Sequence, residues 1–258
     1  MPTTGKDFAR CGGNTSCIEV RVGENLVVFD AGSGIRELGN KLLSEMPIKM
    51  HLFFTHYHWD HIMGFPFFLP LFIPGNEFVI YGEKKGDFSV KRVLEGQMSF
   101  PYFPVKLKDV VKAKVIFKTV RAGQKIVLGD TVVRTIRLKH PMACLGYSIE
   151  RNDSKLVHLT DIEHNSRFDA SLINFCKGAD ALIYDAAYTP EEYETKKGWG
   201  HSTWHEACKL ASEAGVKLLY IFHHDPSHSD AFMENVLKEA KKHFKKTELA
   251  RDHLEKWL

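Results

Sequence analysis

The sequence predicts a layered α/β domain, and three observations lead to this fold class. The chain has 258 residues, of which 44% are hydrophobic, enough to bury a sizeable core. Short apolar runs bounded by turn-forming residues recur along the chain, as strands do. Segments with apolar residues at helical spacing alternate with these runs, above all in the last third. Strand-rich halves with helices between them are typical of layered α/β folds, so we expect residues 1–258 to form one domain.

The individual elements follow in order from these patterns. Residues 18–22 and 26–32 flank the tripeptide Gly-Glu-Asn, which predicts a β-hairpin. Further strands are expected where the apolar runs are short, at 50–55, 77–82, 113–120, 124–138, 145–161, 179–188 and 217–225. Helices are expected where the spacing is helical, at 35–46, 88–98, 169–176, 202–214 and 229–244. Gly129 and Asn152 lie at turn sequences, so the two longest strand runs should each fold into a hairpin.

Composition narrows the class of protein. The net charge of +3 is small, so no strong attraction to nucleic acid or to anionic lipid is expected. The five cysteines are scattered and odd in number, which indicates a reducing compartment rather than a disulfide framework. The N-terminus lacks an apolar signal-peptide segment, and no window reaches the roughly 18 apolar residues of a membrane span. We therefore expect a cytoplasmic protein with no membrane partner.

The sequence Thr-His-Tyr-His-Trp-Asp-His follows the apolar run at 50–54 and carries the clearest chemistry. It places His56, His58, Asp60 and His61 within six positions, where a loop after a strand can turn neighbouring side chains toward one point. Imidazole and carboxylate together suit zinc, manganese or iron. Four such groups exceed what one open catalytic metal needs, so the motif predicts two metals.

Other strands end in the same kind of residue. One predicted strand ends at His140, another at Asp161, and a third at His223 and His224. Each is weak by itself, because a histidine or aspartate after a strand is often structural. Their shared position at strand ends makes them candidates to complete the two-metal centre.

These motifs resemble those of metallo-β-lactamase-fold hydrolases. The family's motifs occur here in order, from the aspartate of Phe-Asp-Ala-Gly (Asp30) through the histidine cluster to the final strand-end histidine. The resemblance implies a four-layer αββα sandwich with two metals at one edge. It assigns three histidines to one metal: His56, His58 and His140. It assigns to the other metal Asp60, His61 and His223. It makes Asp161 the bridging ligand beside a bridging water or hydroxide, and leaves His224 as the alternative to His223.

The sequence Gly-Trp-Gly-His-Ser-Thr indicates a branch of this family. A His-Ser-Thr opening a helix is similar to ribonuclease Z and to cyclic-phosphate phosphodiesterases, in which this histidine contacts the scissile phosphate. The resemblance makes His201 that histidine and Asp185 the acidic residue that orients it, with Asp60 also in the catalytic group. Only about twenty residues separate His140 from Asp161, which leaves no room for the tRNA-gripping arm of ribonuclease Z.

The predicted activity is hydrolysis of a small phosphodiester, a cyclic nucleotide or cyclic phosphate, by a two-metal centre. Zinc is the metal expected first, with manganese or iron as alternatives. A ribonuclease Z-like nuclease acting on short RNA or DNA, and a non-hydrolytic di-iron sensor, are the competing hypotheses. No stable nucleic-acid partner is expected. Cys11 and Cys17 lack obvious partners, so no structural zinc is expected. Apolar loops rich in aromatics and proline indicate a homodimer.

Overall fold

A computed structural model describes residues 1–164 and 167–258. The chain divides into two compact units, each considered separately. The N-terminal unit comprises Met1–Pro2 and Asn14–Arg121, and the C-terminal unit comprises Thr3–Gly13 and Ala122–Leu258. The prediction of one domain over 1–258 remains a prediction.

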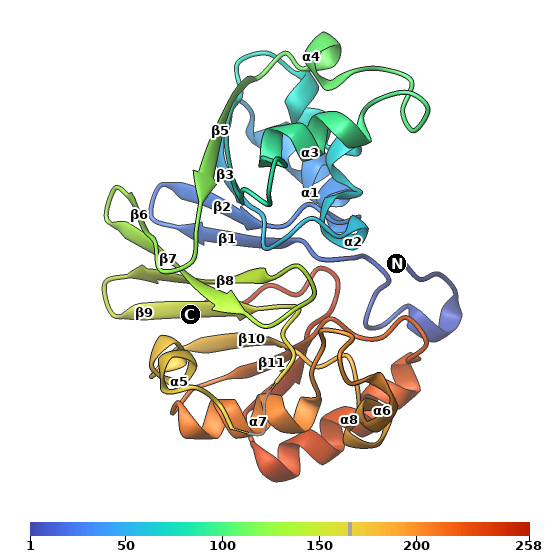
Figure 1. The fold of residues 1–258 in the computed structure, drawn as a ribbon, viewed down its shortest axis with the longest axis vertical. Helices are drawn as coiled ribbons and strands as arrows, with labels where there is room; N and C mark the ends of the chain where they lie inside the picture. The colour runs from blue at the N-terminus through green and yellow to red at the C-terminus, as the bar shows by residue number, and fades with distance from the viewer. Residues whose placement is uncertain (165–166) are drawn as a thin grey trace. The chain divides into compact units, whose positions relative to one another are not determined.

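The N-terminal unit holds a mostly parallel sheet with strand order β1-β2-β3-β4-β5, of which Figure 1 labels β1, β2, β3 and β5. Its strands are β1 (Ile18–Val22), β2 (Asn25–Phe29), β3 (Lys49–Phe53), β4 (Glu77–Glu83) and β5 (Lys114–Val120). Strands β1 and β2 form the predicted antiparallel hairpin, and every later pair is parallel. The carboxyl ends of β2 and β3 therefore lie at the same edge of this sheet, where ligand sites of α/β sheets form.

Helices cover one face of this sheet. They are α1 (Gly34–Leu42), α2 (Trp59–Ile62), α3 (Val90–Gln97) and α4 (Leu107–Val110), with short 3-10 turns η2 (Leu43–Glu45), η3 (Phe65–Phe67) and η4 (Leu69–Phe72). Helix α1 presents Ile35, Leu38 and Leu42 at helical spacing, and they join a buried cluster with Leu52 of β3 and Leu94 of α3. The helices α2 and α4 and the 3-10 turns were not predicted, because each is too short for a periodic pattern.

The C-terminal unit holds a mixed sheet with order β12-β11-β10-β9-β8-β7-β6, of which Figure 1 labels β6 to β11. Its strands are β6 (Lys125–Leu128), β7 (Thr131–Leu138), β8 (Cys144–Arg151), β9 (Ser154–Leu159), β10 (Ala181–Asp185), β11 (Leu219–Phe222) and β12 (Thr247–Leu249). Pairs from β6 to β9 are antiparallel, and pairs from β9 to β12 are parallel. Strands β7, β9, β10 and β11 consequently run in one direction, and their carboxyl ends lie at one edge.

Helices also cover one face of this second sheet. They are α5 (Ala170–Cys176), α6 (Pro190–Lys196), α7 (Trp204–Glu213) and α8 (Asp230–His243), and η1 (Lys6–Phe8) lies in the N-terminal segment of this unit. The buried cluster joins Leu159 of β9, Leu182 of β10 and Ile221 of β11 to Leu210 of α7 and Val236 of α8. The hairpin β8–β9 fills the span between His140 and Asp161, as the sequence predicted. Two sheets, each with a helical layer, confirm the mixed α/β class.

No helix among the residues that the structure describes is both long enough and apolar enough to cross a membrane.

Candidate metal and phosphodiester site

The cluster after β3 is held by the buried carboxylate of Asp30. This residue follows β2 in a left-handed conformation (φ 61°), which costs energy for a non-glycine residue and is stabilised here by its contacts. Its Oδ1 accepts a hydrogen bond from the Thr55 backbone N–H at 2.8 Å, and its Oδ2 accepts one from His61 Nδ1 at 2.7 Å and from Ser16 Oγ at 3.0 Å. Asp30 thus ties together the ends of two neighbouring strands and the loop that precedes β1.

The contact with Asp30 fixes the tautomer of His61. Because the carboxylate accepts from Nδ1–H, the other ring nitrogen, Nε2, keeps its lone pair for a metal. His61 Nε2 lies 3.4 Å from Asp60 Oδ2. Two donors that are each about 2.1 Å from a tetrahedral ion lie about 3.4 Å apart, so this spacing suits two ligands of one ion.

The four predicted ligands of the N-terminal unit lie close together. The ring centroids of His56 and His58 are 4.4 Å apart, and those of His56 and His61 are 4.2 Å apart. His56 and His61 are buried, whereas His58 is exposed at the N-terminus of α2. The structure therefore brings together His56, His58, Asp60 and His61 as one group.

The C-terminal unit brings together a second group at the shared edge of its sheet. One ligand atom from each of four residues lies within 4.8 Å of the others: Asp161, Asp185, His201 and His223. They follow or end the parallel strands β9, β10 and β11, with His201 contributed by the loop before α7. Asp161 and His223 both have left-handed backbones (φ 54° and 60°), and such strain collects at functional sites.

Asp161 lies between two histidines, one near each carboxylate oxygen. Its Oδ2 is 3.7 Å from His140 Nε2, and its Oδ1 is 3.5 Å from His223 Nε2. Both distances are longer than a hydrogen bond and close to the distance between two ligand atoms that bind one metal ion. Oδ2 also lies 4.0 Å from His201 Nδ1, so the Asp161 carboxylate is surrounded by three imidazole rings.

His140 and His224 have different partners from those of His223. His140 Nδ1 donates to the Gly200 carbonyl at 2.7 Å, which leaves Nε2 facing Asp161. His224 Nε2 lies 3.0 Å from the Ala250 carbonyl, to which it donates, and burial lowers the pKa of this ring to about 4. The side chain of His223, and not that of His224, therefore belongs to the group around Asp161.

His201 is oriented by Asp185. Its Nδ1 donates to Asp185 Oδ2 at 2.8 Å, and the same carboxylate accepts hydrogen bonds from the backbone N–H groups of Ile162 and Ala187. Burial lowers the pKa of His201, but the charge and hydrogen bond of Asp185 outweigh it, so the pKa is raised from its ordinary value. The ring stacks on His223 with a centroid separation of 4.9 Å.

The donors in both groups fit divalent metals. Imidazole nitrogens and carboxylate oxygens match borderline ions such as zinc, manganese and iron. His61 and His140 each donate their other ring N–H to an oxygen of the protein, as metal-binding histidines generally do. The chemistry of these residues therefore fits the metals that the sequence motifs predict.

Four supporting residues were not assigned roles from the sequence: Ser16, Thr55, Glu163 and Gly200. Ser16 and Thr55 contact Asp30. Glu163 binds the backbone N–H of Gly200, in the loop before His201, and the Gly200 carbonyl accepts from the ring of His140. Their one sequence signal is proximity to the ligand motifs, because serine, threonine and glycine are common in any loop.

Comparison with known proteins agrees with this geometry. The model of the family described as Beta-lactamase superfamily domain matches residues 25–224. The curated Ribonuclease Z of Thermococcus sibiricus is 24% identical over 278 aligned residues, covering 89% of this chain and 85% of that protein.

Two solved structures show the same fold. The metallo-β-lactamase fold protein YhfI from Bacillus subtilis has a TM-score of 0.71 at 22% identity, with 98% of this chain and 95% of that chain covered. A diphosphatase from the PhnP family has a TM-score of 0.67 at 22% identity, with 94% and 83% covered.

Proposed function

The chain belongs to the β-lactamase superfamily and has the metallo-β-lactamase fold, and from this premise we propose that it hydrolyses a small phosphodiester with two divalent metal ions. The observation that carries the proposal is the group at the sheet edge of the C-terminal unit, where Asp161 lies between two histidines and Asp185 orients a third. A histidine aimed by a carboxylate, beside a group of potential metal ligands, is suited to proton transfer during metal-assisted hydrolysis of a phosphodiester.

We assign seven residues as ligands, on the family match and the order of the motifs. One metal would be held by His56, His58 and His140. The other would be held by Asp60, His61 and His223. Asp161 would be the ligand that the two share. Zinc is the ion we expect first, and manganese or iron would suit the same donors.

When bound, the metals would supply Lewis acidity that offsets the charge of the phosphodiester and makes water a better nucleophile. The residues of the chain then act on the substrate. His201, held with its Nδ1–H on Asp185, presents Nε2 toward the reaction and gives a proton to the departing alkoxide oxygen. The negative Asp185 stabilises the protonated ring, so the ring carries its proton nearer neutral pH. Asp60 serves in the catalytic group as a ligand beside His61.

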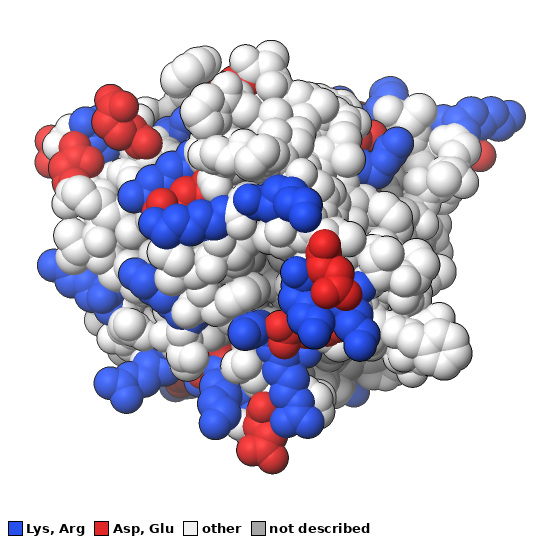
Figure 2. Space-filling view, turned by 90° about the horizontal axis from the view of Figure 1, so that it is seen from above, with Lys and Arg blue, Asp and Glu red and all other residues white. Residues whose placement is uncertain are grey.

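The charge of the surface favours a small substrate over a long polyanion. On the face that Figure 2 shows, lysine and arginine side chains are dispersed in several groups, some with an acidic side chain among them, and uncharged surface separates many of these groups. The net charge of +3 agrees with this distribution. A protein that grips a long nucleic acid generally carries a concentrated basic surface.

A ribonuclease Z-like activity is the second candidate, because the Ribonuclease Z of Thermococcus sibiricus aligns over most of both chains. The protein loaded with zinc, manganese or iron should be assayed on bis-p-nitrophenyl phosphate, cyclic nucleotides and a precursor tRNA. We expect turnover of the small diesters and none of the tRNA. Cleavage of the tRNA without turnover of the small diesters would favour the second candidate.

We also propose a cytoplasmic homodimer. No disulfide joins the five cysteines, all of which lie in the described part of the chain, and this suits a reducing compartment. Phe100 and Tyr102 are 90% and 80% exposed on the N-terminal unit, and a subunit contact would cover them. Light scattering at micromolar concentration tests the dimer, and a monomer under those conditions would refute it.

A further inference from the structure

Glu163 is a buried acidic residue whose carboxylate binds the backbone of a loop distant in the sequence. It follows β9 and is 8% exposed. Its Oε1 accepts hydrogen bonds from the Gly198 N–H at 2.8 Å and the Tyr193 hydroxyl at 3.1 Å, and its Oε2 accepts one from the Gly200 N–H at 3.1 Å. A buried carboxylate needs such donors to offset its desolvation, so this side chain and the Gly198–Gly200 backbone depend on each other.

The loop that Glu163 holds carries two parts of the candidate site. Gly200 uses its N–H to bind Glu163 and its carbonyl to accept from His140 Nδ1 at 2.7 Å, and the next residue is His201. Both glycines have left-handed backbones (φ 87° and 90°), which glycine adopts readily. A Cβ at position 200 would lie 2.3 Å from His140 Nδ1, so the loop can approach this ring only as glycine.

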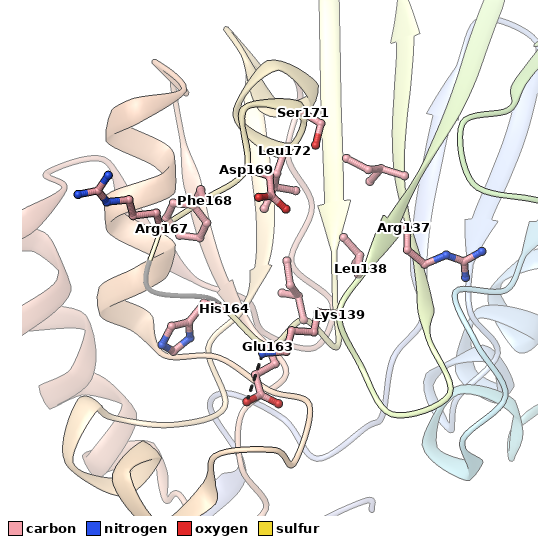
Figure 3. Close-up of a pocket in the computed structure, with 12 residues that line it drawn as sticks. Arg137, Leu138, Lys139, Glu163, His164, Arg167, Phe168, Asp169, Ser171 and Leu172 are labelled. Atoms are coloured by element: carbon pink, nitrogen blue, oxygen red, sulfur yellow. Dashed lines mark ion pairs between the residues drawn. The ribbon is translucent and has the colours of Figure 1, made fainter.

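Glu163 is also joined to the segment that carries His140. Its own backbone N–H donates to the Lys139 carbonyl at 2.7 Å, and the Lys139 ammonium lies 4.0 Å from Oε1. Figure 3 shows this ion pair beside a small pocket of about 60 Å³ that both residues line. One residue therefore links the ends of β7 and β9 to the loop before α7.

A carboxylate is suited to this position for a chemical reason. Its two oxygens accept three hydrogen bonds at once and carry no hydrogen that would oppose the donors. The amide of glutamine has the same shape, but it would turn an NH₂ group toward a backbone N–H or the tyrosine hydroxyl. One contact at least would be lost, and the loop would be free to shift.

We propose that Glu163 is a positioning residue that sets the tautomer and ring position of His140 through the Gly200 carbonyl and aims His201 by fixing its loop. The effect of Glu163 on catalysis rests on the proposed function. Its effect on the His140 tautomer and on the position of the loop does not. Outer partners of metal-binding histidines typically change metal affinity or activity by about 10–100-fold when removed, and we expect a loss of this size.

The first test uses metal-free protein and needs no activity. Nitrogen-15 NMR of the histidine rings reports which ring nitrogen carries the proton. In the wild type we expect His140 in the Nδ1–H form. In Glu163→Gln we expect a mixture of tautomers, because the Gly200 carbonyl is no longer held. Glu194→Gln is the matched control, since Glu194 is exposed on α6 and pairs with Lys197; it should leave the signal unchanged.

The second test measures metal affinity by chelator competition and turnover of bis-p-nitrophenyl phosphate at saturating metal. Glu163→Gln should bind metal about 10–100-fold more weakly and turn over more slowly, while the control matches the wild type. If Glu163→Gln is recovered unfolded, the same measurements are made on Glu163→Asp. Wild-type tautomer and metal affinity in whichever variant folds would overturn the inference. A protein with the expected tautomer change but without hydrolysis in any form would instead refute the proposed function.

Discussion

Asp185 Oδ2 lies 2.8 Å from His201 Nδ1, and this pair joins a carboxylate at the end of β10 to a histidine in the loop before α7. The backbone N–H groups of Ile162 and Ala187 also donate to Asp185. These hydrogen bonds hold the carboxylate in place independently of the His201 ring. The residue at the sheet edge is therefore the rigid member of the pair, and the loop residue is the one that it aims.

His201→Ala should keep its metals and lose turnover. Because His201 is assigned to proton transfer and not to metal binding, we expect unchanged metal content and turnover lowered by about 10²–10⁴-fold. The loss should be larger on a diester with an alkyl leaving group than on bis-p-nitrophenyl phosphate, since a poorer leaving group needs the proton more. Equal losses on the two substrates, or none, would remove His201 from proton transfer.

Asp185→Asn should lower turnover by less than His201→Ala. The amide leaves the ring in place but no longer stabilises its protonated form. We expect a loss of about 10²-fold with unchanged metal content, measured by steady-state kinetics and metal analysis. Asp180→Asn is a suitable control, because Asp180 pairs with exposed Lys217 away from the ring. Turnover equal to the wild type would show that the 2.8 Å contact has no catalytic role.

His223 and His224 form a matched pair for testing the ligand assignment. His223 Nε2 lies 3.5 Å from Asp161 Oδ1, whereas His224 Nε2 contacts the Ala250 carbonyl. We expect His223→Ala to lose bound metal with little change in unfolding free energy of the metal-free protein. His224→Ala should keep its metal and lose about 1 kcal/mol of stability, because it leaves the partly buried Ala250 carbonyl without its donor. Metal analysis and denaturant unfolding would distinguish the two, and the reverse pattern would transfer the ligand role to His224.

The fold class and the grouping of the candidate site residues at strand ends were predictable because they depend on local pattern. Strands such as β3 and helices such as α8 followed from the spacing of apolar residues. The ligand candidates followed from their position at strand ends, since parallel strands bring their carboxyl ends to one edge. The strand ends of the C-terminal unit, at Asp161, Asp185 and His223, meet in this way.

Two kinds of feature were missed. Helix α6 has the sequence Thr-Pro-Glu-Glu with a capping box between Thr189 and Glu192, a local signal that was present but not used. Glu163 carried no such signal, because its partners Gly198 and Gly200 are more than thirty residues away in the sequence. Contacts of this kind depend on the path of the loops, which apolar periodicity does not specify.

The stability of the N-terminal unit should fall in mild acid because of His51. Burial lowers the pKa of this β3 histidine to about 4, and the charges of Lys49 and Lys118 add to the effect, while Glu77 opposes it weakly. The unfolded chain binds a proton near the ordinary histidine pKa of about 6.5, whereas the folded ring does not until about pH 4. The unfolded state therefore binds more protons between these values, and stability falls as the pH falls through this window.

From pH 7 to pH 5 we expect His51 to account for a loss of about 1–2 kcal/mol of unfolding free energy. His51→Phe should remove that part of the dependence, because phenylalanine fills the space beside Tyr81 without titrating. Denaturant unfolding of metal-free protein at both pH values measures the difference between wild type and variant. The other titrating groups are common to both proteins and cancel. The same loss in both proteins would show that His51 is protonated as readily in the folded state as in the unfolded chain.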